Sequence, residues 1–255
     1  MNFPRILKKR KGYIDRIKPF MQKSVAKVLT GQRRVGKSFL LYQLIEEILG
    51  EEPDANIIYI NLEDFAFSSL QTAEDLHSYI ISHSKEKVKN YIFIDEIQDI
   101  PGFEKVIRSL LLNEDNDIYI TGSNAKMLSG ELATYLSGRY IEFKIYSLSY
   151  SEFLEFHGLT ESETSYELYS RYGGLPYLLN LPLEDETVNE YLKSVYSTIV
   201  FRDVVSRYKL RNTLFLEKLI QFLSENIGNL FSAKNISDYL KSQYTTISVN
   251  HIQSY

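Results

Sequence analysis

The segment from Gly31 to Ser38, GQRRVGKS, constrains the fold more than any other part of the sequence. It matches the phosphate-loop pattern G-x-x-x-x-G-K-[ST], in which glycines let successive backbone N–H groups turn toward an anion. A short apolar run, residues 25–30, precedes it, and apolar residues at helical spacing follow it as far as Gly50. A strand, a loop and a helix in this order suit phosphate binding, because the positive end of the helix favours the anion.

Each residue of this segment has an expected role if the bound anion is a nucleoside triphosphate. Lys37 is expected to reach the β- and γ-phosphates, and Ser38 to give an oxygen to Mg²⁺. The rest of the segment and the residue after it would surround the phosphates: Gly31, Gln32, Arg33, Arg34, Val35, Gly36 and Phe39. The alternative is a chance glycine-rich turn, which the flanking strand and helix disfavour.

Strands and helices alternate after the loop, which predicts an α/β fold. The expected strands are residues 56–62, 91–95, 117–123 and 141–146, and the expected helices between them are residues 72–83 and 101–114. With the run before the loop, this gives a P-loop NTPase core, residues 21–148, in which a parallel five-stranded sheet is sandwiched by helices.

Two adjacent acids, Asp95 and Glu96, follow the apolar run YIFI. Open α/β sheets bind ligands at the carboxyl ends of their strands, so both acids are expected to face the phosphate loop. Asp95 suits a magnesium contact, and Glu96 suits orienting and deprotonating an attacking water. The pair therefore favours hydrolysis over phosphoryl transfer to a metabolite, although a surface acid pair that merely ends a strand is the alternative.

Four further polar residues are candidates by the same reasoning. Ser123 or Asn124 ends the next strand and would sense the γ-phosphate or hold the water, unless the segment is a simple turn or helix cap. Asn61 would hydrogen-bond Glu96 in an inactive state. Arg139 would stabilise charge on the transferring phosphoryl group, in its own or a neighbouring subunit, with a structural ion pair as the alternative.

Charge is distributed unevenly along the 255 residues. The net charge is −4, but the first 38 residues carry +11 and the remainder −15. We therefore expect a basic N-terminal arm, residues 1–20, that either attracts nucleic acid or an acidic surface or is simply solvated. The chain has no cysteine, which excludes disulfides and thiolate metal sites and fits a cytoplasmic protein. No apolar run approaches the roughly 20 residues of a membrane helix, so no membrane contact is expected.

The remainder of the sequence has a helical pattern. Residues 149–209 are expected to form a helical lid region. Residues 210–255 contain three helical segments, and Ser232 and Ser248 are expected to cap two of them. The order and spacing of these helices are typical of a winged-helix or helix-turn-helix unit, but no wing strands follow them. These residues carry only four basic side chains against three acidic ones, so DNA affinity there would be weak.

The motifs TGQRRVGKS, FIDEIQ, TGSN, LSGRY and RYGGLP together resemble those of bacterial and archaeal AAA-superfamily ATPases of the STAND class. The resemblance covers residues 12–255 and implies a nucleotide-binding core followed by a winged helix. It also implies that Pro176, in the Gly-Gly-Leu-Pro element, lies against the adenine ring. Members commonly continue into a further domain, sometimes nuclease-like, so we expect the winged-helix segment to be partial.

These patterns predict a Mg²⁺-dependent ATPase that binds ATP or ADP and couples nucleotide state to a protein or DNA partner. A homo-oligomer is compatible with them. Two alternatives stay open. One is a nucleotide-gated protein-interaction switch with little hydrolysis, and the other is a DNA-binding module in which ATP is structural.

Overall fold

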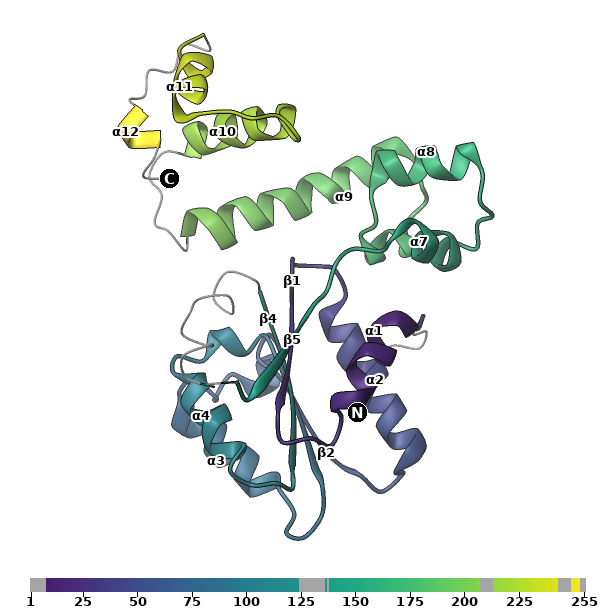
Figure 1. The fold of residues 1–255 in the computed structure, drawn as a ribbon, viewed down its shortest axis with the longest axis vertical. Coiled ribbons are helices and arrows are strands. Elements are labelled where there is room, and N and C mark those ends of the chain that lie inside the picture. The colour runs from purple at the N-terminus through teal and green to yellow at the C-terminus, as the bar shows by residue number, and fades with distance from the viewer. Residues whose placement is uncertain (1–7, 124–135, 137, 207–212, 243–248, 253–255) are drawn as a thin grey trace. The chain divides into compact units, whose positions relative to one another are not determined.

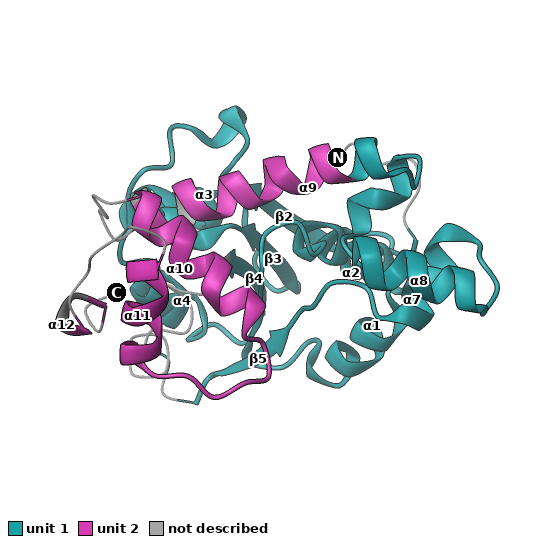
Figure 2. Cartoon of the chain, turned by 90° about the horizontal axis from the view of Figure 1, so that it is seen from above, with its two compact units in different colours: residues 1–188 teal, residues 189–255 magenta. Residues whose placement is uncertain are grey.

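The computed structural model describes residues 8–123, 136, 138–206, 213–242 and 249–252 (Figure 1). The chain divides into two compact units, Met1–Val188 and Asn189–Tyr255 (Figure 2). Sequence patterns placed boundaries after residues 148 and 209, whereas the first helices of the expected lid region belong to the same unit as the sheet. The phosphate loop therefore shares one compact unit with those helices.

The first unit is built on the predicted five-stranded parallel sheet, which is confirmed. The strands are β1 (Ala26–Gly31), β2 (Asn56–Asn61), β3 (Asn90–Asp95), β4 (Asn116–Ser123) and β5 (Tyr140–Lys144), in the order β2-β3-β4-β1-β5. Leu29 of β1 is level with Thr121 of β4, and Gly31 with Ser123. Because all strands run the same way, their carboxyl ends lie at one edge of the sheet.

Helices cover both faces of this sheet (Figure 1). Helices α1 (Lys11–Ile17) and α2 (Lys37–Glu51) pack on one face, and α3 (Ala73–His83) and α4 (Phe103–Leu110) on the other. In β3, Tyr91 and Phe93 face the first pair of helices, whereas Ile92 and Ile94 face the second. Burial on both faces explains why this strand has an almost uniformly apolar sequence.

The expected basic arm is instead part of the first unit in its described residues. Helix α1 and the 3₁₀ helix after it (Lys18–Phe20) pack beside α2, with Ile14 and Ile17 buried. Lys9 and Lys18 pair with Glu47 of α2 at 2.6 and 2.7 Å. The charge count missed this packing because two isoleucines at helical spacing suffice to dock a short amphipathic helix.

The remaining elements are helical. In the first unit these are the short 3₁₀ helices Phe65–Phe67, Ile97–Asp99 and Pro176–Asn180 and the helices α7 (Tyr150–His157) and α8 (Glu163–Tyr172). Helix α9 (Asp185–Thr198) runs into the second unit, followed by a π-helix (Ile199–Ser206), α10 (Thr213–Glu225), α11 (Ala233–Ser242) and α12 (Val249–Ile252). The three expected C-terminal helices are present and share a small apolar core.

Side-chain caps explain where several of these helices begin. Ser149 and Ser162 form capping boxes at α7 and α8. Ser232 accepts a hydrogen bond from Asn235 N at 3.2 Å and so caps α11 as expected, whereas Ser248 lies outside the described residues. Within the described ranges, no helix has both the length and the apolar composition that crossing a membrane requires.

A buried ion pair, Lys27 with Asp117, lies on the face of the sheet that α1 and α2 cover. Lys27 of β1 contacts Asp117 of β4, and neither side chain is exposed to solvent. Asp117 also accepts from Gln22 N and Tyr119 Oη, both at 2.8 Å. Removing one partner of such a pair leaves the other charge buried without its counterion.

We therefore expect Lys27→Met to lower the free energy of unfolding by about 3 to 5 kcal/mol. Urea denaturation measures this change. The matched control is Lys105→Met on the exposed side of α4, which should leave the unfolding midpoint nearly unchanged. Equal midpoints for both variants would contradict the assignment of Lys27 to a buried structural pair.

Candidate functional site

The phosphate-loop segment connects the carboxyl end of β1 to the start of α2, as the sequence predicts. At Gly31, φ is +152°, and a Cβ atom built there would lie only 2.3 Å from the carbonyl oxygen of Ile145. Any other residue would collide with the chain that follows β5. The first glycine of the pattern is therefore required by this close approach as well as by the turn.

The side chain of Lys37 lies against the loop that precedes it. Its Nζ donates to the carbonyl oxygens of Gly31 and Gln32, both at 3.1 Å, and lies 3.8 Å from Glu96 Oε1. The residue is 5% exposed, and this burial lowers the pKa of its ammonium group. The loop thus holds a largely desolvated cation, which strengthens its attraction for an anion.

Asp95 and Glu96 meet this cation from the end of β3. Thr121 of β4 joins them, because its Oγ1 donates to Asp95 Oδ1 and accepts from Glu96 N, the latter at 3.0 Å. Glu96 adopts a left-handed backbone conformation with φ of +56°. Few non-glycine residues adopt this conformation, and those that do are concentrated at functional sites. Sequence patterns assign no role to Thr121, because only the pairing of β4 with β3 brings it to the two acids.

The carboxylate of Glu96 is in an unusual environment. Burial raises its pKa, and the nearby Lys37 ammonium opposes that shift. Glu96 Oε2 accepts from Gln98 Nε2 at 2.5 Å, a partner that sequence patterns did not identify. Asn61 Oδ1 instead accepts from Glu63 N at 3.0 Å, and no hydrogen bond joins Asn61 to Glu96, although both are described residues. A buried carboxylate with a raised pKa is a good general-base candidate.

Ser38 and Asp95 offer oxygen ligands at the same edge of the sheet. Ser38 is the second residue of α2, next to Lys37, and Asp95 presents its carboxylate beside Thr121. Mg²⁺ prefers oxygen ligands and commonly binds through one or two protein groups together with substrate phosphates. The donor chemistry of these two residues therefore fits the expected magnesium.

The Gly-Gly-Leu-Pro element lies against the loop. A Cβ atom built on Gly36 would lie 3.7 Å from Pro176 Cγ. A Cβ atom on Gly174 would lie 2.2 Å from the carbonyl oxygen of Leu148, whose N–H donates to Gly174 O at 2.7 Å. Glycine at 174 thus permits two chain segments to touch, and this contact carries Pro176 to the loop.

The other expected site residues differ in where they lie. The Arg139 carbonyl accepts from Ala26 N at 2.9 Å, which places Arg139 at the amino end of β1. Since β1 advances about 3.3 Å per residue, this is roughly 16 Å from the loop of the same chain. Arg33 pairs with Glu63 at 3.2 Å, and Phe39 is 47% exposed. Asn124 lies outside the described residues.

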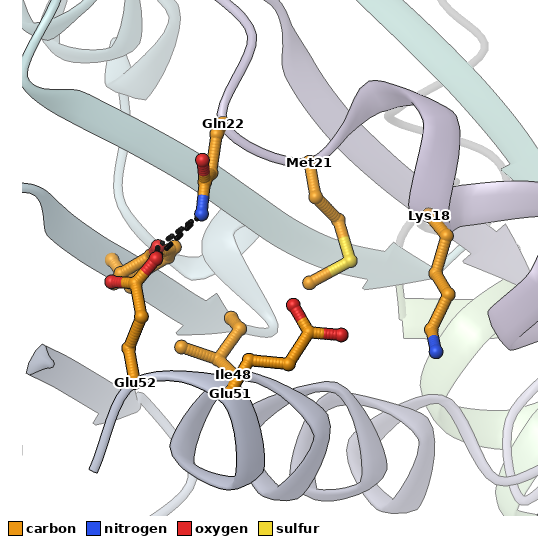
Figure 3. Close-up of a pocket in the computed structure, with 7 residues that line it drawn as sticks. Lys18, Met21, Gln22, Ile48, Glu51 and Glu52 are labelled. Atoms are coloured by element: carbon orange, nitrogen blue, oxygen red, sulfur yellow. Dashed lines mark hydrogen bonds between the residues drawn. The ribbon is translucent and has the colours of Figure 1, made fainter.

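The structure also contains a pocket of about 250 Å³, and Figure 3 shows the residues that line it. Ile48, Glu51 and Glu52 from the C-terminal end of α2 line it, together with Gln22 and Tyr91. The loop precedes the opposite end of α2, so this pocket is separate from the acidic pair and Lys37.

Comparison with known proteins finds two families. The model of the AAA domain family matches residues 23–154, and that of a domain of unknown function (DUF8612) matches residues 163–255. An uncharacterized protein of Haemophilus influenzae is 37% identical over 96% of this chain and 62% of its own length. An uncharacterized protein of Methanocaldococcus jannaschii, MJ1544, is 33% identical over 90% of this chain and 53% of its own length. The chain thus spans less than two thirds of the length of these relatives.

Two of the solved structures found in the comparison share little sequence with this chain. The Aeropyrum pernix ORC1 protein in complex with DNA is 15% identical, with 98% of this chain and 82% of that chain covered and a TM-score of 0.48. The Saccharomyces cerevisiae Hsp104:casein complex is 15% identical, with 78% and 39% covered and a TM-score of 0.49.

Proposed function

Because the chain belongs to the AAA domain family of P-loop ATPases, we propose that it binds Mg·ATP at residues 31–38 and hydrolyses it, with Glu96 as the general base. The observation that carries this proposal is the meeting of three groups at one edge of the sheet. The Lys37 ammonium lies 3.8 Å from Glu96 Oε1, and Asp95 is joined to Glu96 through Thr121. Lys37 begins α2 and the two acids stand at the end of β3, so residues far apart in the sequence bring opposite charges together.

The chemistry follows from where charge changes during hydrolysis. Lys37 would leave the loop carbonyls and donate to the β- and γ-phosphates, and the backbone N–H groups of the loop would hold the remaining phosphate oxygens. Mg²⁺ bound by Ser38 and Asp95 would neutralise charge that develops on the phosphates. Glu96 would orient a water in line with the β–γ bond and accept its proton. Pro176, next to the loop, would contact the nucleotide base, as the family resemblance implies.

Arg139 fits a role in a second copy of the chain better than in its own. Its position at the amino end of β1, far from the loop of its own chain, supports this role. We propose that it stabilises the γ-phosphate held by a neighbouring copy. A native mass measurement with Mg·ATP tests this assembly, and a mass that stays at one copy at every concentration would count against it.

The two alternatives are a DNA-binding module with structural ATP and a nucleotide-gated switch with little hydrolysis. For the DNA-module alternative, the basic N-terminal segment is the better candidate for contacting DNA, and two of its lysines, Lys9 and Lys18, pair with Glu47. A switch with little hydrolysis would use the same loop and would leave Glu96 without a catalytic task. Protein and DNA partners, and cytoplasmic location, stay predictions from the sequence.

The decisive assay for the proposed function is phosphate release from ATP. We expect steady release in the presence of Mg²⁺, complete loss on adding excess EDTA, and recovery when MgCl₂ is restored. The assay is run with and without DNA. Tight Mg·ATP binding without turnover in either condition would favour the switch over the ATPase.

A further inference from the structure

Arg10, which precedes α1, is buried beside the phosphate loop. Only 4% of the residue is exposed. Its backbone N–H donates to Gln43 Oε1 of α2 at 2.8 Å, and its guanidinium carbon lies 4.5 Å from the centre of the Tyr13 ring. The first contact holds the backbone of Arg10 against α2, and the second places its side chain over a ring of α1. Burying an arginine is costly unless its donors are satisfied, so its partners indicate why it is there.

All five guanidinium N–H groups have an oxygen partner. Nη1 donates to the carbonyl oxygens of Val35 at 3.2 Å and Tyr146 at 2.8 Å. Nε and Nη2 donate to the two carboxylate oxygens of Glu152, both at 2.8 Å, and Nη2 also donates to Ser147 O at 3.3 Å. These partners belong to three segments: the phosphate loop, the connection between β5 and α7, and the first turn of α7.

The bond to Val35 bears on the loop directly. A peptide group is planar, and in its trans form the C=O and N–H point in opposite directions. Because Arg10 holds the Val35 carbonyl toward itself, the N–H of Gly36 in the same peptide points away from Arg10. Gly36 is the residue before Lys37, at the start of α2, where backbone N–H groups bind anions. Arg10 therefore fixes the direction of a phosphate-binding donor without touching the phosphate.

The bonds to Glu152 extend this control to α7. Partial burial would raise the pKa of Glu152, but hydrogen bonds from Arg10 and Ser149 hold that pKa below its ordinary value. The same carboxylate accepts from Ser149 N at 2.9 Å and so closes the cap of α7. The segment before α7 continues to Leu148, which contacts Gly174 close to Pro176. Arg10 thus links the phosphate loop to the segment before α7. That segment in turn contacts the Gly-Gly-Leu-Pro element, whose Pro176 lies against the loop.

We propose that Arg10 is a positioning residue that orients the Gly36 N–H and couples nucleotide binding at the loop to the start of α7. This inference rests on the proposed nucleotide binding. Coupling is reciprocal, so a bound nucleotide also stabilises the contacts of Arg10 with α7. A purely structural arginine would affect unfolding alone.

The test compares Arg10→Lys with Arg16→Lys, an exposed arginine on α1. Lysine keeps the charge but cannot make the forked contacts. Mg·ADP affinity, measured by calorimetry well below each unfolding midpoint, is expected to fall about tenfold for Arg10→Lys and to stay at the wild-type value for Arg16→Lys. Unchanged affinity in Arg10→Lys overturns the proposal, whereas a wild-type chain that binds no nucleotide overturns the proposed function first.

A double-mutant cycle with Glu152→Gln separates positioning from general destabilisation. If Arg10 and Glu152 act through one link, the double variant should bind Mg·ADP about as weakly as Arg10→Lys alone. Losses that simply add would contradict the link. Should Arg10→Lys fail to fold, hydrogen exchange of the wild-type chain replaces it. Residues 8–13 and 146–152 should then gain protection with Mg·ADP, and unchanged protection would overturn the coupling.

Discussion

Replacing Lys37 with Ala is expected to weaken Mg·ATP binding strongly. The ammonium is buried in the loop and close to Glu96, so the substitution removes the main cation and leaves a carboxylate facing the phosphates. Truncating one member of a buried charged contact costs about 2 to 5 kcal/mol, or roughly 30- to 4,000-fold in affinity. Isothermal titration calorimetry measures this loss.

The control is Lys105→Ala, which removes an exposed ammonium on α4 and should bind Mg·ATP like the wild-type chain. Circular dichroism establishes that both variants are folded. A Lys37→Ala variant with wild-type affinity would show that the nucleotide lies elsewhere. Binding should also weaken as the pH rises through the lowered pKa of Lys37, because the uncharged amine attracts the phosphates less.

The second large effect is expected from Glu96→Gln, which should keep nucleotide affinity and lose turnover. Glutamine keeps the shape and can still contact water, but it cannot accept a proton. Loss of a general base lowers the rate by about 10²- to 10⁴-fold. Phosphate release and calorimetry, done on the same preparation, separate the rate from the affinity. Glu114→Gln, an exposed glutamate in the turn before β4, is the matched control.

The pH profile gives a second readout of the same residue. Burial raises the pKa of Glu96 above its ordinary 4.5, and only the ionised carboxylate accepts a proton. Turnover in the wild-type chain should therefore fall as the pH drops through that raised value, and this acid limb should disappear from any residual activity of Glu96→Gln. A variant that retains both wild-type turnover and the acid limb would remove Glu96 from the mechanism.

Local spacing in the sequence was sufficient to predict some of the site. The loop residues are contiguous, and the apolar run before Asp95 predicts a buried strand that ends in an acid. Parallel strands then bring the loop and the acid to one edge of the sheet, as the structure confirms. Periodicity does not give strand order, however, so the sequence does not predict that β4 lies between β1 and β3. The contact of Thr121 with the two acids depends on that order and was not predicted either.

Tertiary contacts account for what the sequence missed. Arg10 looks like one more charge in a basic run, and only its partners across 25 to 142 residues of sequence distinguish it from Arg16. The same run predicted a basic arm, either solvated or attracted to an acidic partner, because net charge carries no information about the two isoleucines that dock α1. Arg139 follows a glycine in the sequence, and only its hydrogen bond with Ala26 shows which edge of the sheet it occupies.

The most direct test of nucleotide binding at this loop is a crystal structure with Mg²⁺ and a non-hydrolysable ATP analogue. The account predicts density for the β- and γ-phosphates within hydrogen-bond distance of Lys37 Nζ and the Gly36 N–H. It also predicts Mg²⁺ between the phosphates, Ser38 Oγ and the Asp95 carboxylate. Analogue density at another place, such as the pocket beside Glu51 and Tyr91, with the loop still closed on Lys37, would contradict it.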